Sequence, residues 1–194
     1  HPRILRRHIP FVAVGVGNAG RVKRRAVEAN HFFLRAADEV GLPALRHRIE
    51  HVQLLHFDDA ARLAQLDVIA SMQPIHATSD MPWAVDRLGP LRVPWGYAWK
   101  EILGTGATLA FGSDAPVETY DPRVGLGVAL TRADPRTGVA YAPGLALTAD
   151  AAITAYTAGA AAALGLPEGR LGRISRGASA DLTCWAADPG PWPW

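Results

Sequence analysis

The sequence is poor in cysteine and contains no long apolar run. Its single cysteine, Cys184, excludes an internal disulfide framework and is typical of proteins that fold in a reducing compartment. No stretch of about 18 uninterrupted apolar residues occurs, which excludes a conventional membrane-spanning helix. The amino-terminal residues HPRILRRHIP also lack the apolar core of a secretory signal. We therefore expect a cytoplasmic protein with no membrane partner.

Net charge is also low, apart from a basic stretch near the amino terminus. The 194 residues carry a formal net charge of +2, with 49% hydrophobic and 20% charged residues, the balance of an ordinary globular domain. The basic stretch RVKRR at residues 21–25 has no aromatic residues interleaved and no nucleic-acid-binding motif around it. We interpret it as a solvated surface and expect no nucleic-acid partner.

Short apolar stretches alternate with helical patterns along the chain. Strands are predicted at 11–16, 46–55, 68–74 and 107–114, and helices at 21–40, 58–66, 97–106, 121–132 and 147–165. A loop rich in proline and tryptophan is predicted between the third strand and the helix that follows it. Alternation of strand and helix is the pattern of a parallel α/β sheet, in which functional residues collect at the carboxyl ends of the strands.

Polar side chains follow three of the predicted strands at the point where each strand ends. His51 follows RIE, Gln73 and His76 follow SM, and Asp114 ends the apolar run ATLAFGSD. A buried carboxylate without a partner is costly, so Asp114 needs a partner, a metal or a chemical function. Because neighbouring strands end at the same edge of a sheet, we expect these side chains to lie together at that edge. We call this place the mouth.

A histidine and a carboxylate at one mouth can bind a divalent metal. Imidazole nitrogen and carboxylate oxygen both suit Zn²⁺, and a catalytic site leaves one position open for water. The metal lowers the pKa of that water, and a carboxylate beside it can take the proton and pass it to a leaving amine. From the residues alone, a hydrogen-bonded structural pair of His51 and Asp114 explains the pattern equally well.

Five motifs occur in a characteristic order and spacing. They are RIEHVQ (48–53), SMQPIHATSD (71–80), YAWKEILGTGATLAFGSDAPVE (97–118), LTADAAITAYTAGAAAALG (147–165) and GRISRGASADL (172–182). Together they resemble the carboxyl-terminal half of the YtcJ-like metal-dependent amidohydrolases, amidohydrolase family 3, over residues 44–187. This group also contains N-substituted formamide deformylases.

The resemblance implies the carboxyl-terminal part of a (β/α)8 TIM barrel, followed by a few strands of a small β-sandwich. It implies that His51, at the end of the sixth barrel strand, is a metal ligand. It further implies that Asp114, at the end of the eighth strand, is a metal ligand and the catalytic residue that handles the proton of the water. The residues implied for the substrate pocket, in the loop after the seventh strand, are Gln73, His76 and Asp80.

The resemblance also divides the chain into segments. Residues 1–43 form a divergent segment that matches the fifth barrel strand and its helix. Residues 44–166 hold strands six to eight with their helices, and residues 167–194 belong to the β-sandwich and the tail. Cys184 lies on an alternating tail strand and is expected to be a core residue.

The sequence lacks several ligands that the resemblance implies. No H-x-H pair occurs, and the two lysines, Lys23 and Lys100, lie at no predicted strand end. In FVAVGVGNAG (11–20), a glycine stands where the fifth strand is expected to end in histidine. Either the chain is the carboxyl-terminal part of a longer amidohydrolase, or it is a degenerate copy that no longer binds metal. We expect it to be incomplete and inactive by itself.

The leading hypothesis is a hydrolase of carbon–nitrogen bonds other than peptide bonds. The expected substrate is a small molecule of amide or formamide type, and the expected cofactor is a divalent metal, zinc in the first place. The rival hypothesis is a non-catalytic remnant that serves as a structural or interaction module. An incomplete barrel leaves strand edges open, which favours association with another chain, including a homo-oligomer.

Overall fold

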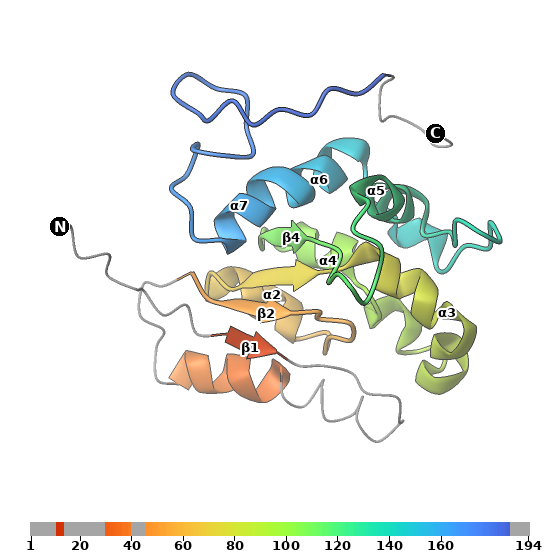
Figure 1. Ribbon diagram of the computed structural model, residues 1–194. Helices are drawn as coiled ribbons and strands as arrows, with labels where there is room; N and C mark the ends of the chain where they lie inside the picture. Colours follow the sequence, from red (N-terminus) through yellow and green to blue (C-terminus); the bar gives the residue numbers. More distant parts are fainter. Residues whose placement is uncertain (1–10, 14–29, 40–45, 187–194) are drawn as a thin grey trace.

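Four parallel strands form the centre of the structure. The computed structural model describes residues 11–13, 30–39 and 46–186, and Figure 1 shows the sheet with its helices. The strands are β1 (Phe11–Ala13), β2 (Arg48–Glu50), β3 (Ile69–Met72) and β4 (Leu109–Phe111). They lie in the order β1-β2-β3-β4, and each of these pairings is parallel. The predicted parallel α/β sheet is confirmed.

Helices connect these strands and follow the last one. They are a helix over residues 30–39, α2 (Asp59–Gln65), α3 (Pro74–Leu88), η1 (Val93–Trp95), α4 (Trp99–Gly104), α5 (Pro122–Thr131), η2 (Pro143–Leu145), α6 (Ala149–Thr154), η3 (Ala155–Gly159) and α7 (Ala160–Ala163). Neighbouring parallel strands need crossover connections, and the helices between β1 and β4 supply them.

The strand register gives the sheet two chemically different faces. The apolar face carries Ile49, Ala70, Met72, Leu109 and Phe111, all within the main hydrophobic core. On the opposite face, Arg48 donates to Glu50 Oε1 and to the carbonyl of Ala163 in α7. Because a strand alternates its side chains between faces, one face is suited to apolar packing, and polar groups on the other need partners.

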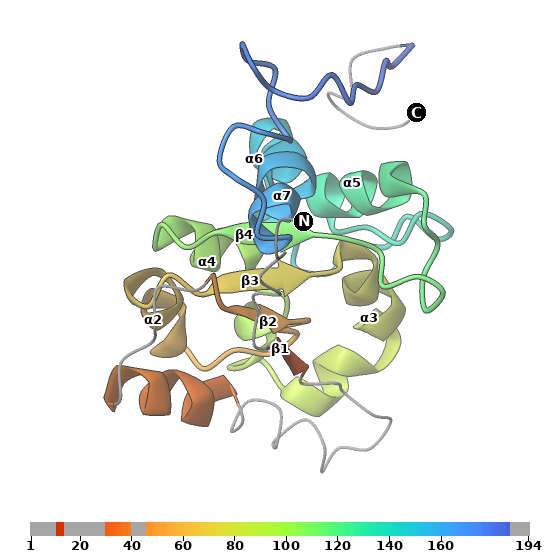
Figure 2. The same ribbon diagram turned by 60° about the vertical axis from the view of Figure 1, so that its left-hand side comes forward.

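Helices α2 and α4 pack against the sheet through its apolar face. Helix α2 contacts β3, and α4 contacts both α2 and β4. Trp99 of α4 is fully buried, and its ring meets Phe111 edge-on with 5.8 Å between the ring centroids. Burial of a large apolar side chain contributes about 2 kcal/mol to stability. Figure 2 shows α3 and α5 at the opposite end of the strands from α2, and contacts join α3 to α5.

Helices α6, η3 and α7 form one continuous rod beside β4. Thr148 caps its first turn, since its hydroxyl oxygen accepts from the Ala151 backbone N–H at 3.3 Å. Gly159 allows the close approach to β4: a Cβ at this position would lie 1.9 Å from the Leu109 carbonyl oxygen. The predicted helix over 147–165 is therefore present, with a π-helical turn in its middle.

Arg132 is a fully buried arginine that joins the segment after α5 to the segment before α4. Its guanidinium donates to three backbone carbonyls, those of Tyr141 at 2.7 Å, Tyr97 at 2.8 Å and Gly96 at 3.3 Å. The same group lies 4.5 Å from the ring centroid of Trp99. Charge-assisted hydrogen bonds and ring stacking together compensate for the burial of the cation.

Two predictions of local structure are wrong. The segment after β3 forms α3 instead of a loop, with Pro74 at its start, where a missing N–H costs no hydrogen bond. Pro82, which favoured the loop interpretation, lies inside this helix. The strand-like pieces predicted in the tail are also absent, because residues 167–186 contain no strand and Cys184 is exposed.

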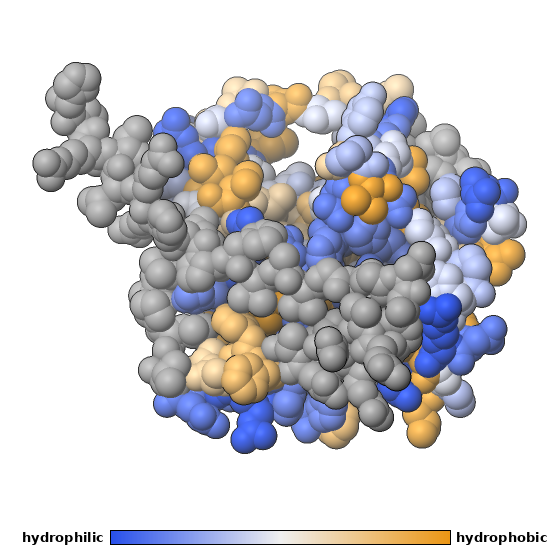
Figure 3. Space-filling view, turned by 60° about the horizontal axis from the view of Figure 1, so that its bottom comes forward, coloured by the Kyte–Doolittle hydropathy of each residue, from blue (hydrophilic) through white to orange (hydrophobic). Residues whose placement is uncertain are grey.

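Two features of the surface complete the description. Among the described helices, none is long and apolar enough to cross a membrane. Figure 3 shows hydrophilic and hydrophobic residues interspersed over the described part of one face. The basic stretch at 21–25 and the glycines of FVAVGVGNAG lie outside the described residues.

Candidate metal centre

The segments that follow β2, β3 and β4 bring two histidines and an aspartate together. His51 Nδ1 lies 4.0 Å from Asp114 Oδ2, and His76 Nε2 lies 3.9 Å from the same oxygen. The two imidazole rings are stacked, with 5.8 Å between their centroids. One ligand atom from each of the three residues lies within 4.8 Å of the others. The carboxyl ends of three neighbouring strands therefore meet at one mouth.

The backbone at His51 changes the direction of its side chain. Simple alternation would place His51 on the same face as Ile49, the apolar face of the sheet. However, φ is 70° at His51 and 40° at Val52, in the left-handed region that residues with side chains seldom occupy. Val52 is then buried in the core, and His51 faces Gln73 and Asp114. Such strain is typical of functional positions.

Gln73 orients His51. The side chain of Gln73, the residue that precedes α3, accepts from His51 Nδ1 through Oε1 at 2.9 Å. In a neutral imidazole, a proton on Nδ1 leaves the lone pair on Nε2. A partner of this kind fixes the tautomer and the ring plane of a metal-ligating histidine.

His76 lies in the first turn of α3 and carries a buried nitrogen that has no partner in the described part of the chain. Its Nε2 has no hydrogen bond among the described residues, and its Nδ1 lies 3.5 Å from Gln53 Nε2. Burial lowers the pKa of the His76 imidazole below its ordinary value, and His51 acts in the same direction. The carboxylates of Glu118, Asp114 and Asp80 oppose this shift. The ring is therefore held in its neutral form, which can ligate a metal or hydrogen-bond a substrate.

Asp114 stands at the rim of the mouth. Its side chain is 38% exposed, so the expectation that it is buried is wrong. A φ of 55° at Asp114 turns the chain away directly after the strand end. A carboxylate in this position remains hydrated while it faces both histidines, which avoids the cost of burying its charge.

Asp80 lies one turn further along α3 and pairs with Tyr97. The Tyr97 hydroxyl donates to Asp80 Oδ2. Burial, together with the Asp80 carboxylate, raises the pKa of the Tyr97 phenol, which keeps the phenol protonated as a donor. Tyr97 has a φ of 53°, and its carbonyl accepts from Arg132 at 2.8 Å. The buried arginine thus holds the backbone that presents the tyrosine.

The residues present fit a divalent metal. Two imidazoles and a carboxylate are the donors that Zn²⁺ prefers, and the buried Nε2 of His76 is a polar atom without a protein partner in the described structure. Of the five residues predicted from the sequence, four lie together: His51, Gln73, His76 and Asp114. Asp80 lies one turn further along α3 and pairs with Tyr97.

Sequence reasoning missed the contributions of Tyr97 and Arg132 to this region. In the sequence, Tyr97 only begins the motif at 97–118, and Arg132 follows a predicted helix without any motif around it. The pairing with Asp80 depends on the tertiary contact between α3 and the segment before α4.

Fold and site together define a mixed α/β protein in which side chains that can ligate a metal lie at the carboxyl ends of its parallel strands. Comparison with known proteins then gives the family. The family model described as "Amidohydrolase family" matches residues 23–190. The chain therefore belongs to the amidohydrolase family.

Several curated proteins are similar to the chain. YtcJ of Bacillus subtilis (strain 168), named as an amidohydrolase, is 36% identical over 147 residues, which cover 74% of this chain and 28% of YtcJ. The Arabidopsis thaliana protein LONG AFTER FAR-RED 3 is 36% identical over 138 residues, covering 71% and 24%. Imidazolonepropionase of Anaeromyxobacter dehalogenans (strain 2CP-C) is 32% identical over 154 residues, covering 78% and 30%. The chain spans less than a third of the length of these relatives.

Two solved structures share the fold. Both are described as uncharacterized metal-dependent hydrolases. The protein from Pyrococcus furiosus is 29% identical with a TM-score of 0.70, and the match covers 88% of this chain and 36% of that one. The protein from Pyrococcus horikoshii OT3 is 27% identical with a TM-score of 0.73, covering 88% and 37%. The resemblance to the YtcJ-like amidohydrolases is confirmed.

Proposed function

We propose that the mouth formed by His51, His76 and Asp114 serves the hydrolysis of carbon–nitrogen bonds other than peptide bonds, in small substrates of amide or formamide type. The observation that carries the proposal is the convergence of three potential ligand atoms within 4.8 Å at the ends of neighbouring parallel strands. Family membership supports the reaction class, since the matched family is that of the amidohydrolases.

The strands β1 to β4 are proposed to be strands five to eight of a (β/α)8 barrel. Sequential order of parallel strands supports this, because a doubly wound sheet reverses its order at a switch point, whereas a barrel wall does not. In the proposed division, residues 44–166 carry the last three strands and their helices. Residues 1–43 precede them, and residues 167–194 form the tail, in which 167–186 contain no strand.

His51 and Asp114 are the proposed metal ligands, with zinc as the proposed ion. When bound, a divalent ion would polarise the substrate carbonyl and lower the pKa of a water beside it. His51 offers Nε2 as the ligand atom, because Gln73 accepts from its Nδ1. Asp114 is exposed at the rim and can offer one carboxylate oxygen to the ion.

Proton transfer is assigned to Asp114. Its carboxylate can accept the proton of the attacking water and return it to the leaving nitrogen. The leaving amine must be protonated before the carbon–nitrogen bond breaks, so one group that serves both steps is sufficient. Asp114 is 38% exposed at the rim, so water can reach its carboxylate.

The remaining residues are proposed to position the substrate. His76 is neutral and presents Nε2 toward Asp114, so it can carry the proton on that atom and donate to the substrate carbonyl. Gln73 can donate through its amide nitrogen while its oxygen holds His51. Asp80 is held by Tyr97 at the same mouth and can accept from a substrate N–H.

A chimera tests the function. The corresponding carboxyl-terminal residues of YtcJ are replaced by this chain, and hydrolysis of a panel of amides and N-formyl amines is measured with zinc supplied. We expect turnover by the chimera, a loss of at least about 100-fold in kcat for Asp114→Asn, and no turnover by the chain alone. Glu39→Gln on the helix over 30–39 is the matched control and should retain activity.

A folded chimera without turnover would contradict the proposal and favour the rival, a non-catalytic module. Folding is checked by far-UV circular dichroism and gel filtration. Zinc content separates two reasons for failure: a chimera that binds zinc but does not turn over lacks the catalytic arrangement, and one that binds none at the mouth has lost the metal.

A further inference from the structure

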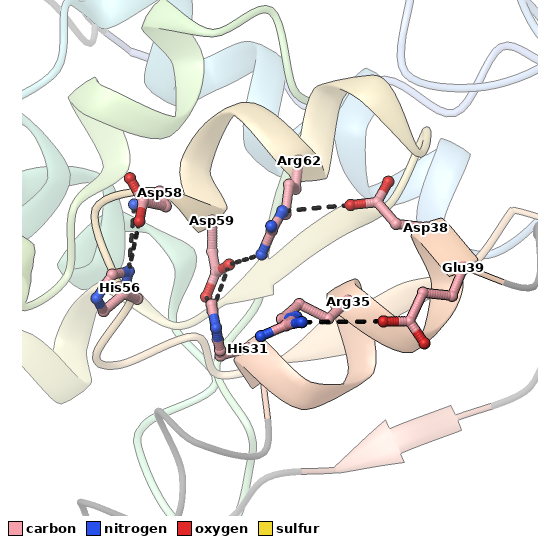
Figure 4. Close-up of polar contacts among 8 residues, drawn as sticks. All are labelled: His31, Arg35, Asp38, Glu39, His56, Asp58, Asp59 and Arg62. Atoms are coloured by element: carbon pink, nitrogen blue, oxygen red, sulfur yellow. Dashed lines mark hydrogen bonds and ion pairs between the residues drawn. The ribbon is translucent and has the colours of Figure 1, made fainter.

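A second cluster of metal-ligating side chains joins the helix over residues 30–39 to α2, apart from the residues of the mouth. Figure 4 shows His31 facing Asp59, with Arg62 on the other side of the same carboxylate. His31 Nδ1 lies 2.9 Å from Asp59 Oδ1 and 3.0 Å from Oδ2, and Arg62 Nη1 donates to Oδ1 at 3.1 Å. His56 Nδ1 lies 3.6 Å from Asp58 Oδ2.

We propose that His31, His56 and Asp59 form a structural zinc site, with Asp58 as the fourth ligand. One ligand atom from each of the first three residues lies within 4.8 Å of the others. The rings of His31 and His56 are tilted, with 5.2 Å between their centroids, so both imidazoles border the same small volume. The site shares no residue with the mouth and does not depend on the proposed hydrolysis.

The distances suit tetrahedral coordination after a small adjustment. Two ligands at 2.0–2.1 Å from zinc in a tetrahedral arrangement lie about 3.3 Å apart. His31 Nδ1 is 2.9 to 3.0 Å from the two Asp59 oxygens, so a displacement of only a few tenths of an ångström admits the ion. A neutral imidazole can carry its proton on Nε2, which leaves His31 Nδ1 to coordinate.

Arg62 hydrogen-bonds one oxygen of the Asp59 carboxylate and leaves the other available to a metal. Arg62 Nη1 donates to Asp59 Oδ1, which leaves Oδ2 as the oxygen for zinc. Arg62 Nε also lies 3.3 Å from Asp38 Oδ2 on the helix over 30–39. Ligating carboxylates are commonly hydrogen-bonded by such outer partners, which orient them toward the metal.

The charge of the cluster also suits a divalent cation. Asp59 has no exposed side-chain surface, so its charge requires compensation. The guanidinium of Arg62 pairs with the carboxylates of Asp38 and Asp59, and Asp58 lies against His56. While the histidines are neutral, these three carboxylates exceed the one cation that contacts them by two negative charges. A zinc ion would balance this excess. It would also fasten the helix over 30–39 to α2.

The test is cobalt and zinc binding by the whole chain after treatment with a chelator. A background carrying His51→Gln and Asp114→Asn disables the mouth. In this background we expect one equivalent of Co²⁺ to give the strong visible absorption of a tetrahedral site, and Zn²⁺ to displace it. Adding His31→Gln or His56→Gln should weaken binding by more than about 10-fold, beyond the effect of losing an outer partner.

Glu39→Gln is the matched control. It removes a carboxylate from the same helix, at an exposed pair with Arg35, and should leave the affinity for Co²⁺ unchanged. If it weakens binding as much as His31→Gln, general negative charge holds the metal and the proposed ligand set is wrong. Absence of binding in the mouth-disabled background would also overturn the proposal.

A second measurement needs no substitution in the cluster. In the unmodified chain, zinc should protect His31 and His56 from carbethoxylation, as read residue by residue by mass spectrometry. Unchanged modification of these two histidines at saturating zinc would overturn the proposal. Protection of His51 and His76 reports the mouth separately, so failure at one site is distinguished from failure at the other.

Discussion

His76 Nε2 lies 3.9 Å from Asp114 Oδ2, although the two side chains come from the start of α3 and from the end of β4. This distance is too long for a direct hydrogen bond and short enough for both atoms to reach one small ligand. The histidine is buried while the aspartate is exposed, so the pair combines a neutral ring with a hydrated carboxylate. The space between them is the point at which substrate, water and metal would meet.

Because the His76 ring is held neutral in the folded state, the free energy of unfolding of the metal-free chain is expected to depend on pH. Its folded pKa lies below the unfolded value of 6.5, because burial disfavours the imidazolium. As pH falls below 6.5, the unfolded chain binds this proton more readily than the folded chain, so the free energy of unfolding decreases. Well above 6.5, both states are neutral at this ring and the penalty disappears.

NMR titration of the His76 ring in the presence of chelator should give a midpoint below 6.5, and His76→Gln should remove this part of the pH dependence of unfolding. A midpoint at or above 6.5 would contradict the assignment.

Removal of the partner of His51 should weaken metal binding at the mouth. Gln73→Ala deletes the acceptor of the His51 Nδ1 proton, which frees the ring to rotate and to change tautomer. We expect the affinity for Zn²⁺ at the mouth to fall by about 10- to 100-fold, measured by competition with a chromophoric chelator. Gln73→Glu keeps an acceptor oxygen and is the matched control. Equal losses in the two variants would argue against an orienting role.

Substitution of Gly159 should separate the terminal rod from β4. A Cβ in Gly159→Ala would lie 1.9 Å from the Leu109 carbonyl oxygen, so the rod must shift. Overpacking of this kind costs about 1–3 kcal/mol of the free energy of unfolding, measured by urea denaturation.

Gly104→Ala is its counterpart at the end of α4, since a Cβ there meets nothing within 4 Å. It should stabilise the chain by about 0.4–1 kcal/mol. Similar effects of the two substitutions would show that the close approach to β4 is unimportant.

Loss of Arg132 should destabilise the chain strongly. Arg132→Met keeps the apolar stem but removes the guanidinium donor from three carbonyls, of which that of Tyr97 still accepts from the Trp99 N–H. The expected loss is about 3 kcal/mol or more in the free energy of unfolding. Arg123→Met is the control, because Arg123 forms an exposed pair with Asp121, and should change stability little. A small effect of Arg132→Met would mean that water replaces the guanidinium.

The sequence by itself determined the class of the fold and the positions that can carry chemistry. Period-two apolar runs alternating with helical patterns predict a parallel sheet, and β2, β3 and β4 lie within those runs. A polar residue that follows an apolar run marks the end of a strand. The sequence alone therefore identifies His51, Gln73 and Asp114 as residues at strand ends.

Only the tertiary structure decided how those residues face one another. The left-handed backbone at His51 and Asp114 overrides strand alternation, and no local pattern predicts it. Contacts between distant segments, such as Tyr97 with Asp80 and His31 with Asp59, arise from the packing of helices on the sheet. Local sequence specifies the elements because backbone and side-chain preferences act over a few residues. The site depends on burial and on contacts between elements that are far apart in the sequence. Only the assembled core provides these.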